Sequence, residues 1–350
     1  MEITIRIDEL NNKLKSKFFI VILSNEENLK KCIENNIAGF PETDNGIWAY
    51  LDINEGDYVS FYYNGRIFNL YKVEKKLIPE YYKKSNNSIG NERYDPVPLN
   101  NGDKWRAIST KKGNIYFPYR LSLKLLEKTD FLTSLVFKSG FERFGINLIP
   151  RVSLKKSHFQ LSLSDINKIF GIKNLGVNLS SFTLKDFVEV FSKNKDINKE
   201  KFSVENIVDK EIFLQTLIKR ILEASIYKYK EVIFDKISFD KDSFEFFSEQ
   251  TVYGGEADIV IANNSENIAF VEVKNGIILK KDGEFTRIGS EAYNQVKSYQ
   301  DIINLNKKIR KIIAGKKDFG SRDVLLKIFE KKPENIIVIE VNSRFEILSL

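Results

Sequence analysis

Two stretches decide how the C-terminal part of this chain folds: Gly255-Glu256-Ala257-Asp258-Ile259-Val260-Ile261-Ala262 and Ile268-Ala269-Phe270-Val271-Glu272-Val273-Lys274. Both are short apolar runs rich in β-branched residues, which predicts buried strands over residues 256–262 and 268–273. A hairpin brings opposite ends of its two strands together. Asp258, near the start of the first strand, and Glu272, near the end of the second, are therefore expected at one edge of a sheet.

The sequence around this hairpin predicts a compact α/β domain over residues 206–350. Apolar residues recur at helical spacing over residues 209–230, which indicates an amphipathic helix packed on a sheet. A strand is expected at residues 248–252, a helix at 290–304 and a final strand at 335–341. The predicted order is helix, three strands, helix and strand.

The hairpin carries the residues of a candidate cation site. Alternation along a strand puts Glu272 and Lys274 on one face. The carboxylates of Asp258 and Glu272, with the backbone carbonyl of Val273, suit a hard cation such as Mg²⁺, with Mn²⁺ as a substitute. Lys274 would then orient or help to deprotonate an attacking water. The alternative is a solvent-facing salt bridge, but the apolar neighbours indicate a buried strand, where unpaired charges are costly.

Three motifs follow one another in this domain: Gly255-x-x-Asp258, Glu272-x-Lys274 and Gln295-x-x-x-Tyr299. Together they resemble the PD-(D/E)xK nuclease superfamily, especially its RecB-like branch, over about residues 206–350. The resemblance implies a restriction-endonuclease-like mixed sheet flanked by helices. It assigns Asp258, Glu272 and Val273 to the metal and Lys274 to the attacking water. The proline that often precedes the aspartate in this family is absent here.

The same resemblance gives roles to residues on the two helices. Gln295 and Tyr299 would support the site or contact the DNA backbone, although by themselves they are also an ordinary i,i+4 pair on a helix surface. A glutamate on the first core helix often completes the metal site in the family. Glu223 and Glu211 are both candidates, and the sequence does not choose between them.

Residues 1–130 predict a small mixed α/β barrel, followed by a helical connector over residues 131–205. Strands are expected at residues 17–24, 47–51, 57–63 and 66–74. The dipeptide Asn64-Gly65 lies between two alternating apolar runs and is a strong hairpin signal.

The segment from Gly56 to Tyr63, with tryptophans before and after it, is similar to EVE/PUA-like domains. Such domains hold a flipped, often modified nucleobase in an aromatic pocket, where stacking offsets the loss of base pairing. The resemblance implies a pocket formed by Trp48, Trp105, Phe40 and Tyr62. For any one of these side chains, a place in the barrel core is the competing interpretation.

The length of 350 residues is typical of two domains plus a connector. The chain has 55 Lys and Arg against 48 Asp and Glu, a net charge of +7. Residues 1–200 hold 31 basic and 24 acidic residues, whereas residues 201–350 hold 24 of each. The excess therefore favours contact between the N-terminal part and a polyanion such as DNA.

Several classes of site and location are excluded by the composition. A single cysteine, Cys32, excludes an intramolecular disulfide and multi-cysteine metal centres, and a single histidine, His158, excludes a histidine-rich metal site. No apolar run reaches about 18 residues, and no signal-peptide pattern begins the chain. We therefore expect no membrane association and a cytoplasmic location in a prokaryotic cell.

These observations predict a Mg²⁺-dependent DNA endonuclease, of restriction or defence type, that reads a modified (methylated) base through its N-terminal domain. One alternative is a site-specific restriction endonuclease that reads unmodified double-stranded DNA. Another is a non-catalytic nucleic-acid-binding protein with a nuclease-like fold. Because one active site per chain cuts one strand, a homodimer is expected on DNA.

Overall fold

The computed structural model of the chain describes residues 2–6, 10, 13–77, 117–133, 152, 154, 156–162, 166, 169–171, 179–195, 202–207, 210–234, 244–263, 266–332 and 334–347. The chain forms two compact units. We call residues 1–14 with 181–350 the C-terminal unit, and residues 15–180 the inserted unit. The expected domain boundaries, at residues 130 and 205, differ from this division. The first strand belongs to the C-terminal unit, and the inserted unit extends to residue 180.

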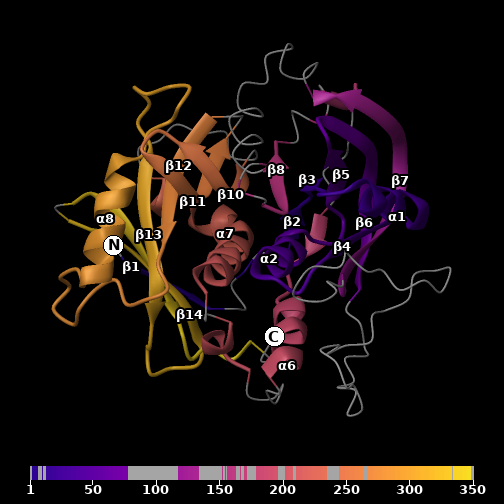
Figure 1. Ribbon diagram of the computed structural model, residues 1–350. Helices are drawn as coiled ribbons and strands as arrows, with labels where there is room; N and C mark the ends of the chain where they lie inside the picture. The colour runs from indigo at the N-terminus through magenta and orange to yellow at the C-terminus, as the bar shows by residue number, and fades with distance from the viewer. Residues whose placement is uncertain are drawn as a thin grey trace. The chain divides into compact units, whose positions relative to one another are not determined.

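The C-terminal unit is built on a mixed seven-stranded sheet with the order β1-β14-β15-β13-β12-β11-β10 (Figure 1). The strands β12, β13 and β15 run parallel to one another, and the other neighbours are antiparallel. The strands are β1 (Glu2–Arg6), β10 (Phe244–Val252), β11 (Gly255–Asn263), β12 (Glu266–Val273), β13 (Arg310–Lys317), β14 (Val324–Lys331) and β15 (Ile336–Asn342). The expected mixed α/β organisation is confirmed.

Two helices flank this sheet, α7 (Glu211–Ile233) and α8 (Arg287–Ser298). Helix α7 contacts β10, β11 and β12, and its apolar stripe is buried as the periodicity predicts. Helix α8 packs Ala292 and Val296 against Phe270 and Ile313 of the sheet. The unit also contains α6 (Lys185–Lys195) and the short 3₁₀ helix η3 (Val204–Asn206).

Helix α8 lies closer to the N-terminus than the expected span of 290–304. The side chain of Thr286 accepts a hydrogen bond from the backbone N–H of Gly289, and this N-cap starts the helix at Arg287. The backbone becomes extended at Tyr299, which ends the helix six residues before the expected position. The early end leaves Tyr299 just beyond the helix, with its ring turned into the core.

Three strands of this sheet were not predicted. In β13 and β14 the apolar residues are flanked or interrupted by lysine and arginine, which hides the strand pattern. Strand β1 pairs with β14, more than three hundred residues later in the chain, and Ile5 is fully buried there. No local sequence pattern indicates a pairing between strands so far apart along the chain.

The inserted unit contains a six-stranded sheet, with the order β4-β7-β6-β5-β3-β8, that curls into a half-barrel. Only β3 and β5 are parallel neighbours. The elements are β3 (Phe18–Ile22), α1 (Glu26–Asn35), β4 (Ile37–Phe40), α2 (Asp44–Asp52), β5 (Tyr58–Tyr63), β6 (Arg66–Leu77), β7 (Tyr119–Leu132) and β8 (His158–Leu161). A separate two-stranded sheet consists of β2 (Lys13–Lys15) and β9 (Leu179–Ser181).

The hairpin predicted at Asn64-Gly65 is confirmed. Tyr63 pairs with Arg66, so the loop between β5 and β6 has two residues. Both loop residues have positive φ, 46° for Asn64 and 76° for Gly65. A tight turn of this kind requires such angles at both central positions, and Asn-Gly adopts them at low cost.

The strand predicted over residues 47–51 is wrong, because these residues belong to helix α2. The side chain of Thr43 accepts a hydrogen bond from the N–H of Gly46 and starts the helix, and Asp44 lies in its first turn. From Gly46 to Asp52 every residue of the helix is buried. A helix buried on all sides has no polar face, so its sequence resembles a buried strand.

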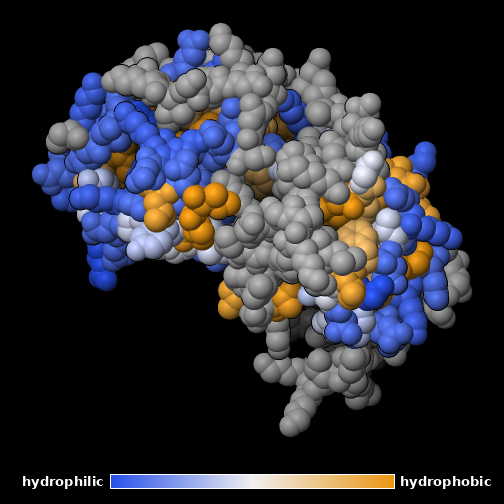
Figure 2. Space-filling model, turned by 90° about the horizontal axis from the view of Figure 1, so that it is seen from above, coloured by the Kyte–Doolittle hydropathy of each residue, from blue (hydrophilic) through white to orange (hydrophobic). Residues whose placement is uncertain are grey.

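Large apolar side chains reach the surface of both units. Those more than half exposed among the described residues are Leu154, Tyr253, Ile277 and Ile303. On the face drawn in Figure 2, orange hydrophobic areas stand beside extended blue hydrophilic surface. No helix within the described residues is long and apolar enough to cross a membrane.

Strand β1 gives a test of the division into units. We expect Ile5→Ala to lower the stability of the C-terminal unit by about 2–4 kcal/mol, because it deletes a fully buried side chain. Both tryptophans lie in residues 15–180, so their fluorescence reports the inserted unit. In urea, the circular-dichroism transition of the C-terminal unit should shift while the tryptophan transition stays. The exposed Thr4→Ala is the control, and a shift confined to the tryptophan signal would contradict the assignment.

Candidate active site

The carboxylates of Asp258 and Glu272 come together where the ladder between β11 and β12 ends. Ile259 pairs with Val271, so Asp258 stands opposite Glu272 on the same face of the sheet. The strands separate at this point, and a carboxylate oxygen of Asp258 accepts a hydrogen bond of 2.6 Å from the backbone N–H of Val273. The structure therefore brings together the two acids that the hairpin pattern predicts to meet.

Lys274 joins these acids to the start of α7. Its ammonium lies 2.7 Å from Glu272 Oε1 and 3.3 Å from Glu211 Oε1. The other oxygen of Glu211 accepts a hydrogen bond from the backbone N–H of Asn275. The Glu272 side chain is only 1% exposed, so this ion pair is largely shielded from water. Buried pairs of this kind are strongly coupled because solvent screens them little.

Tyr299 holds the second oxygen of Glu272. Its hydroxyl lies 2.8 Å from Glu272 Oε2 and 2.9 Å from the backbone carbonyl of Glu256. A hydroxyl has one proton and donates to one of these acceptors at a time. Gln295, one turn earlier in α8, donates its side-chain N–H to the same hydroxyl at 2.8 Å. Gln295 and Tyr299 thus form a chain of hydrogen bonds that ends at the buried Glu272 carboxylate.

The environment of the acids disfavours their negative charge. Burial raises the pKa of Asp258 well above its ordinary value, and the charge of Glu272 raises it further. Burial also raises the pKa of Glu272, although the hydrogen bond from Lys274 opposes the change. A cation bound at this site would stabilise the ionised form of both acids.

Lys274 and Tyr299 both stay protonated in this environment. Burial lowers the pKa of Lys274, but Glu272 and the other nearby acids outweigh that effect and raise it overall. Burial raises the pKa of the Tyr299 hydroxyl, and the Glu272 charge adds to this. Lys274 is therefore a permanent cation in the site, and Tyr299 is a permanent hydrogen-bond donor.

Of the two glutamates left open by the sequence, Glu211 is the one placed at the site. It is the first residue of α7, where the helix dipole favours an acidic side chain, and it contacts Lys274. Glu223 lies twelve residues further along the same helix, about 18 Å away at 1.5 Å per residue. It is therefore far from Lys274.

Gln215 is a site residue that the sequence reasoning missed. It is buried in α7, one turn after Glu211, and its side-chain amide donates to the backbone carbonyl of Asp258. Its position was signalled only by the i,i+4 spacing of Glu211 and Gln215 in the first turns of the helix. The amide fixes the backbone of a residue whose carboxylate is in the site.

The neighbouring strand is irregular next to the same residue. Ser248 pairs with Ile259 and Gln250 with Ala257, so Glu249 stands opposite Asp258 in an unchanged register, but the ladder has no pair between these two residues. Glu249 has a φ of 45°, a left-handed conformation that is uncommon for a side chain of this kind. The β10–β11 ladder is thus interrupted at Asp258, whose backbone carbonyl accepts a hydrogen bond from Gln215.

The residues fit a divalent cation that keeps much of its water. The ligands would be the two carboxylates and the Val273 carbonyl, all oxygen donors of the kind that Mg²⁺ prefers. Glu272 Oε1 is buried, and its partner is the ammonium of Lys274 at 2.7 Å. Within the described part of the chain, no three His, Cys, Asp or Glu side chains form a ready-made metal-binding group. The proposed protein ligands are thus fewer than those of a closed structural metal site.

Two of the four aromatic residues assigned to a base pocket lie in the core. The side chains of Trp48 and Phe40 are 0% and 2% exposed, so their rings belong to the core of the inserted unit. Trp48 packs edge-on against His158 at 4.4 Å between ring centroids. Tyr62 is partly buried beside the same core, and Trp105 lies outside the described residues. Neither Trp48 nor Phe40 presents a face on which a base could stack.

We compared the sequence with known protein families and with curated proteins, and neither comparison found a match.

The pKa of Asp258 predicts how the stability of the metal-free protein depends on pH. The folded protein binds a proton at Asp258 more readily than the unfolded chain, whose pKa stays near 3.8. The stabilisation that this proton provides is complete below pH 3.8. It is lost as the pH rises through the higher pKa that Asp258 has in the folded protein. In EDTA, the wild-type Tm should therefore fall across that pH window.

Asp258→Asn should flatten this dependence and raise the Tm at pH 8, by about 2–4 °C for each kcal/mol of relieved repulsion. The matched control is Asp323→Asn, which changes an exposed aspartate in the same unit and should leave the curve unchanged. Differential scanning calorimetry gives both curves. A lower Tm of Asp258→Asn at pH 8 would show that the Asp258 charge is stabilising, contrary to this account.

Proposed function

We propose that this protein is a metal-dependent DNA endonuclease of the PD-(D/E)xK type. The observation that carries the proposal is the buried Glu272 carboxylate, which is paired with Lys274, bonded to Tyr299 and placed beside Asp258. Residues from α7, β11, β12 and α8 converge on it. The hairpin alone accounts for the meeting of Asp258 and Glu272, whereas the approach of Glu211 and Tyr299 depends on how α7 and α8 pack on the sheet.

The electrostatics favour a functional over a structural role. Two acids whose pKa values are raised, chiefly by burial, reduce the stability of the metal-free protein, and apolar residues would be the simpler choice for a buried strand end. Proteins retain such strain mainly at functional sites. In a lone surface salt bridge the carboxylate would be exposed, and its pKa would not be raised.

Asp258, Glu272 and the Val273 carbonyl would hold Mg²⁺, for which Mn²⁺ is a substitute. When bound, the ion lowers the pKa of a coordinated water and offsets negative charge on the phosphate. Tyr299 and Gln295 keep the Glu272 carboxylate in a single orientation. Gln215 holds the backbone carbonyl of Asp258 in place.

Lys274 is the residue that acts on the substrate. An ammonium group has three donors, and Glu272 and Glu211 take two of them. The third is free to bind the attacking water or a phosphate oxygen. Its raised pKa keeps Lys274 charged, which suits a group that orients the nucleophile and stabilises charge on the phosphate.

The inserted unit is proposed to read the DNA. Residues 1–200 carry the whole net charge of +7, which suits contact with phosphates. A modified base is the proposed target, as in EVE/PUA-like domains. With Trp48 and Phe40 in the core, the stacking surface would have to come from Tyr62 and Trp105. Cleavage of both strands would require a homodimer.

Lys274→Met separates catalysis from binding. With Mg²⁺, wild-type protein should nick a plasmid in its methylated or its unmethylated form, and on that plasmid the variant should be at least about 100-fold slower. Affinity for DNA, measured with Ca²⁺ in place of Mg²⁺, should change little. The control Lys280→Met alters an exposed lysine a few residues away. Failure of the wild type to cut with any divalent cation, or full activity of Lys274→Met, would contradict the proposed function.

The proposed target is tested with matched plasmids that differ only in base methylation. A protein that depends on modification should cut the methylated plasmid and leave the unmethylated one intact, because only the modified base is held in the reader. Equal cutting of both would instead identify a site-specific endonuclease that reads unmodified sequence. Binding without cutting would identify the non-catalytic alternative.

A further inference from the structure

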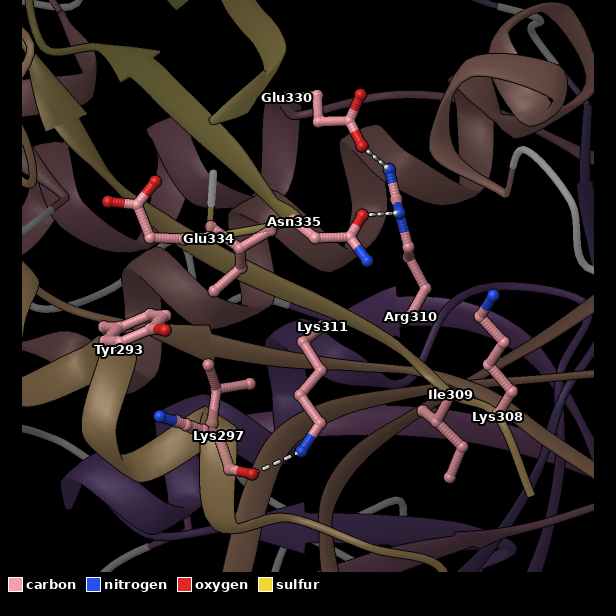
Figure 3. Close-up of a pocket in the computed structure, with 11 residues that line it drawn as sticks. Tyr293, Lys297, Lys308, Ile309, Arg310, Lys311, Glu330, Glu334 and Asn335 are labelled. Atoms are coloured by element: carbon pink, nitrogen blue, oxygen red, sulfur yellow. Dashed lines mark hydrogen bonds and ion pairs between the residues drawn. The ribbon is translucent and has the colours of Figure 1, made fainter. Parts of the chain in front are cut away.

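A second candidate site lies at the start of β13, three residues before the position level with Glu272. A cavity of about 350 Å³ is formed by the end of α8, the start of β13 and the turn between β14 and β15 (Figure 3). Four cationic side chains line it: Lys297, Lys308, Arg310 and Lys311. None of them belongs to the motifs considered above.

The cavity is distinct from the active site but close to it. Arg310 pairs with Ala269, whereas Ile313 pairs with Glu272, a separation of three residues or about 10 Å along the strands. Lys311 pairs with Phe270, and Phe270 shares a sheet face with Glu272. The cavity and the carboxylates thus open near the same face of one sheet.

Arg310 has donors to spare. Its two terminal nitrogens donate to Asn335 Oδ1 and Glu330 Oε1, each at 3.0 Å, as Figure 3 shows. Its Nε is buried and has no hydrogen-bond partner. A guanidinium carries five donors, so several remain for a ligand with acceptor oxygens.

Lys311 also has a donor left over. Its ammonium donates to the backbone carbonyls of Lys297 and Tyr299, which caps the end of α8 and offsets its negative dipole. The third N–H has no acceptor among these bonds. Burial lowers the pKa of Lys311, and the nearby charge of Lys297 lowers it further. An anion between the two lysines would relieve that repulsion.

Two acids line the cavity beside the four cations. Glu330 is paired with Arg310, and Glu334 Oε1 lies 3.4 Å from the ammonium of Lys331, while its buried Oε2 accepts no hydrogen bond from the described residues. Among the described residues, neither Lys297 nor Lys308 has a carboxylate within ion-pair distance. The cavity therefore keeps unneutralised positive charge.

We propose that this cavity binds the phosphate of a nucleotide. Phosphate oxygens accept hydrogen bonds from Arg310 and Lys311, while Lys297 and Lys308 supply charge. Tyr293 and Ile309 add an apolar wall suited to the sugar or base. The volume lies in the range of small-ligand sites. The nucleotide is either free or part of the DNA strand that reaches the carboxylates, and the second source rests on the proposed function.

The test uses the full chain in EDTA, so that cutting plays no part. Inorganic phosphate, a deoxynucleoside monophosphate and a short single-stranded oligonucleotide are titrated separately by calorimetry. The double variant Lys297→Gln/Lys308→Gln should weaken binding at least about tenfold, or 1.4 kcal/mol. Lys281→Gln changes an exposed lysine outside the cavity and should bind as the wild type does. Because both pocket lysines are exposed, the double variant should keep the wild-type Tm.

The outcomes separate the two sources and the two proposals. Binding of the mononucleotide and of phosphate identifies a free nucleotide site, and binding of the oligonucleotide alone identifies a strand subsite. If the wild type cuts DNA but the double variant binds every probe normally, the cavity proposal is overturned and the nuclease stands. If nucleotides bind through these lysines but no divalent cation supports cutting, the cavity proposal is supported and the nuclease proposal is rejected. No binding of any probe overturns the cavity proposal.

Discussion

The burial of the Glu272 carboxylate is the constraint around which the C-terminal unit is arranged. An ionised carboxylate removed from water must be paired and hydrogen-bonded, or it takes up a proton. Lys274 provides the charge and Tyr299 provides the hydrogen bond. These partners come from different elements, so the packing of the sheet and of α8 depends on satisfying one side chain.

The same constraint explains the local distortions near the site. Lys274 reaches Glu211 as well as Glu272, which ties the first turn of α7 to the end of β12. Asp258 turns its carboxylate to the backbone of Val273 where the strands separate, and its carbonyl is supported by Gln215 opposite Glu249, whose φ is positive. At both places the backbone leaves the regular pairing of the sheet, and a side chain makes the hydrogen bond that a neighbouring strand would otherwise make.

The parts predictable from sequence are those set by local periodicity. Alternation in β12 predicted that Glu272 and Lys274 share a face, the apolar spacing predicted α7, and Asn64-Gly65 predicted its hairpin. The choice of Glu211 over Glu223 was not predictable, because it depends on which turn of α7 lies over β12. The pairing of β1 with β14 depends on contacts across nearly the whole chain.

Burial patterns set a second limit on the sequence reasoning. Helix α2 is apolar on every side, so periodicity could not distinguish it from a strand. For the same reason, aromatic residues in the inserted unit could not be divided by sequence into core and pocket. Trp48 and Phe40 proved to be core, since a small half-barrel needs large side chains to fill it.

The charge balance of the C-terminal part hides a separation that matters for function. Residues 201–300 hold 13 basic and 17 acidic residues, whereas residues 301–350 hold 11 basic and 7 acidic ones. The acidic part supplies Glu211, Asp258 and Glu272, and the basic part supplies most of the cations of the cavity. A neutral total is therefore compatible with binding a polyanion. The carboxylates would repel a phosphate unless a metal ion stands between them. The cations of the cavity, which include Arg310 about 10 Å away along the strands, would attract one directly.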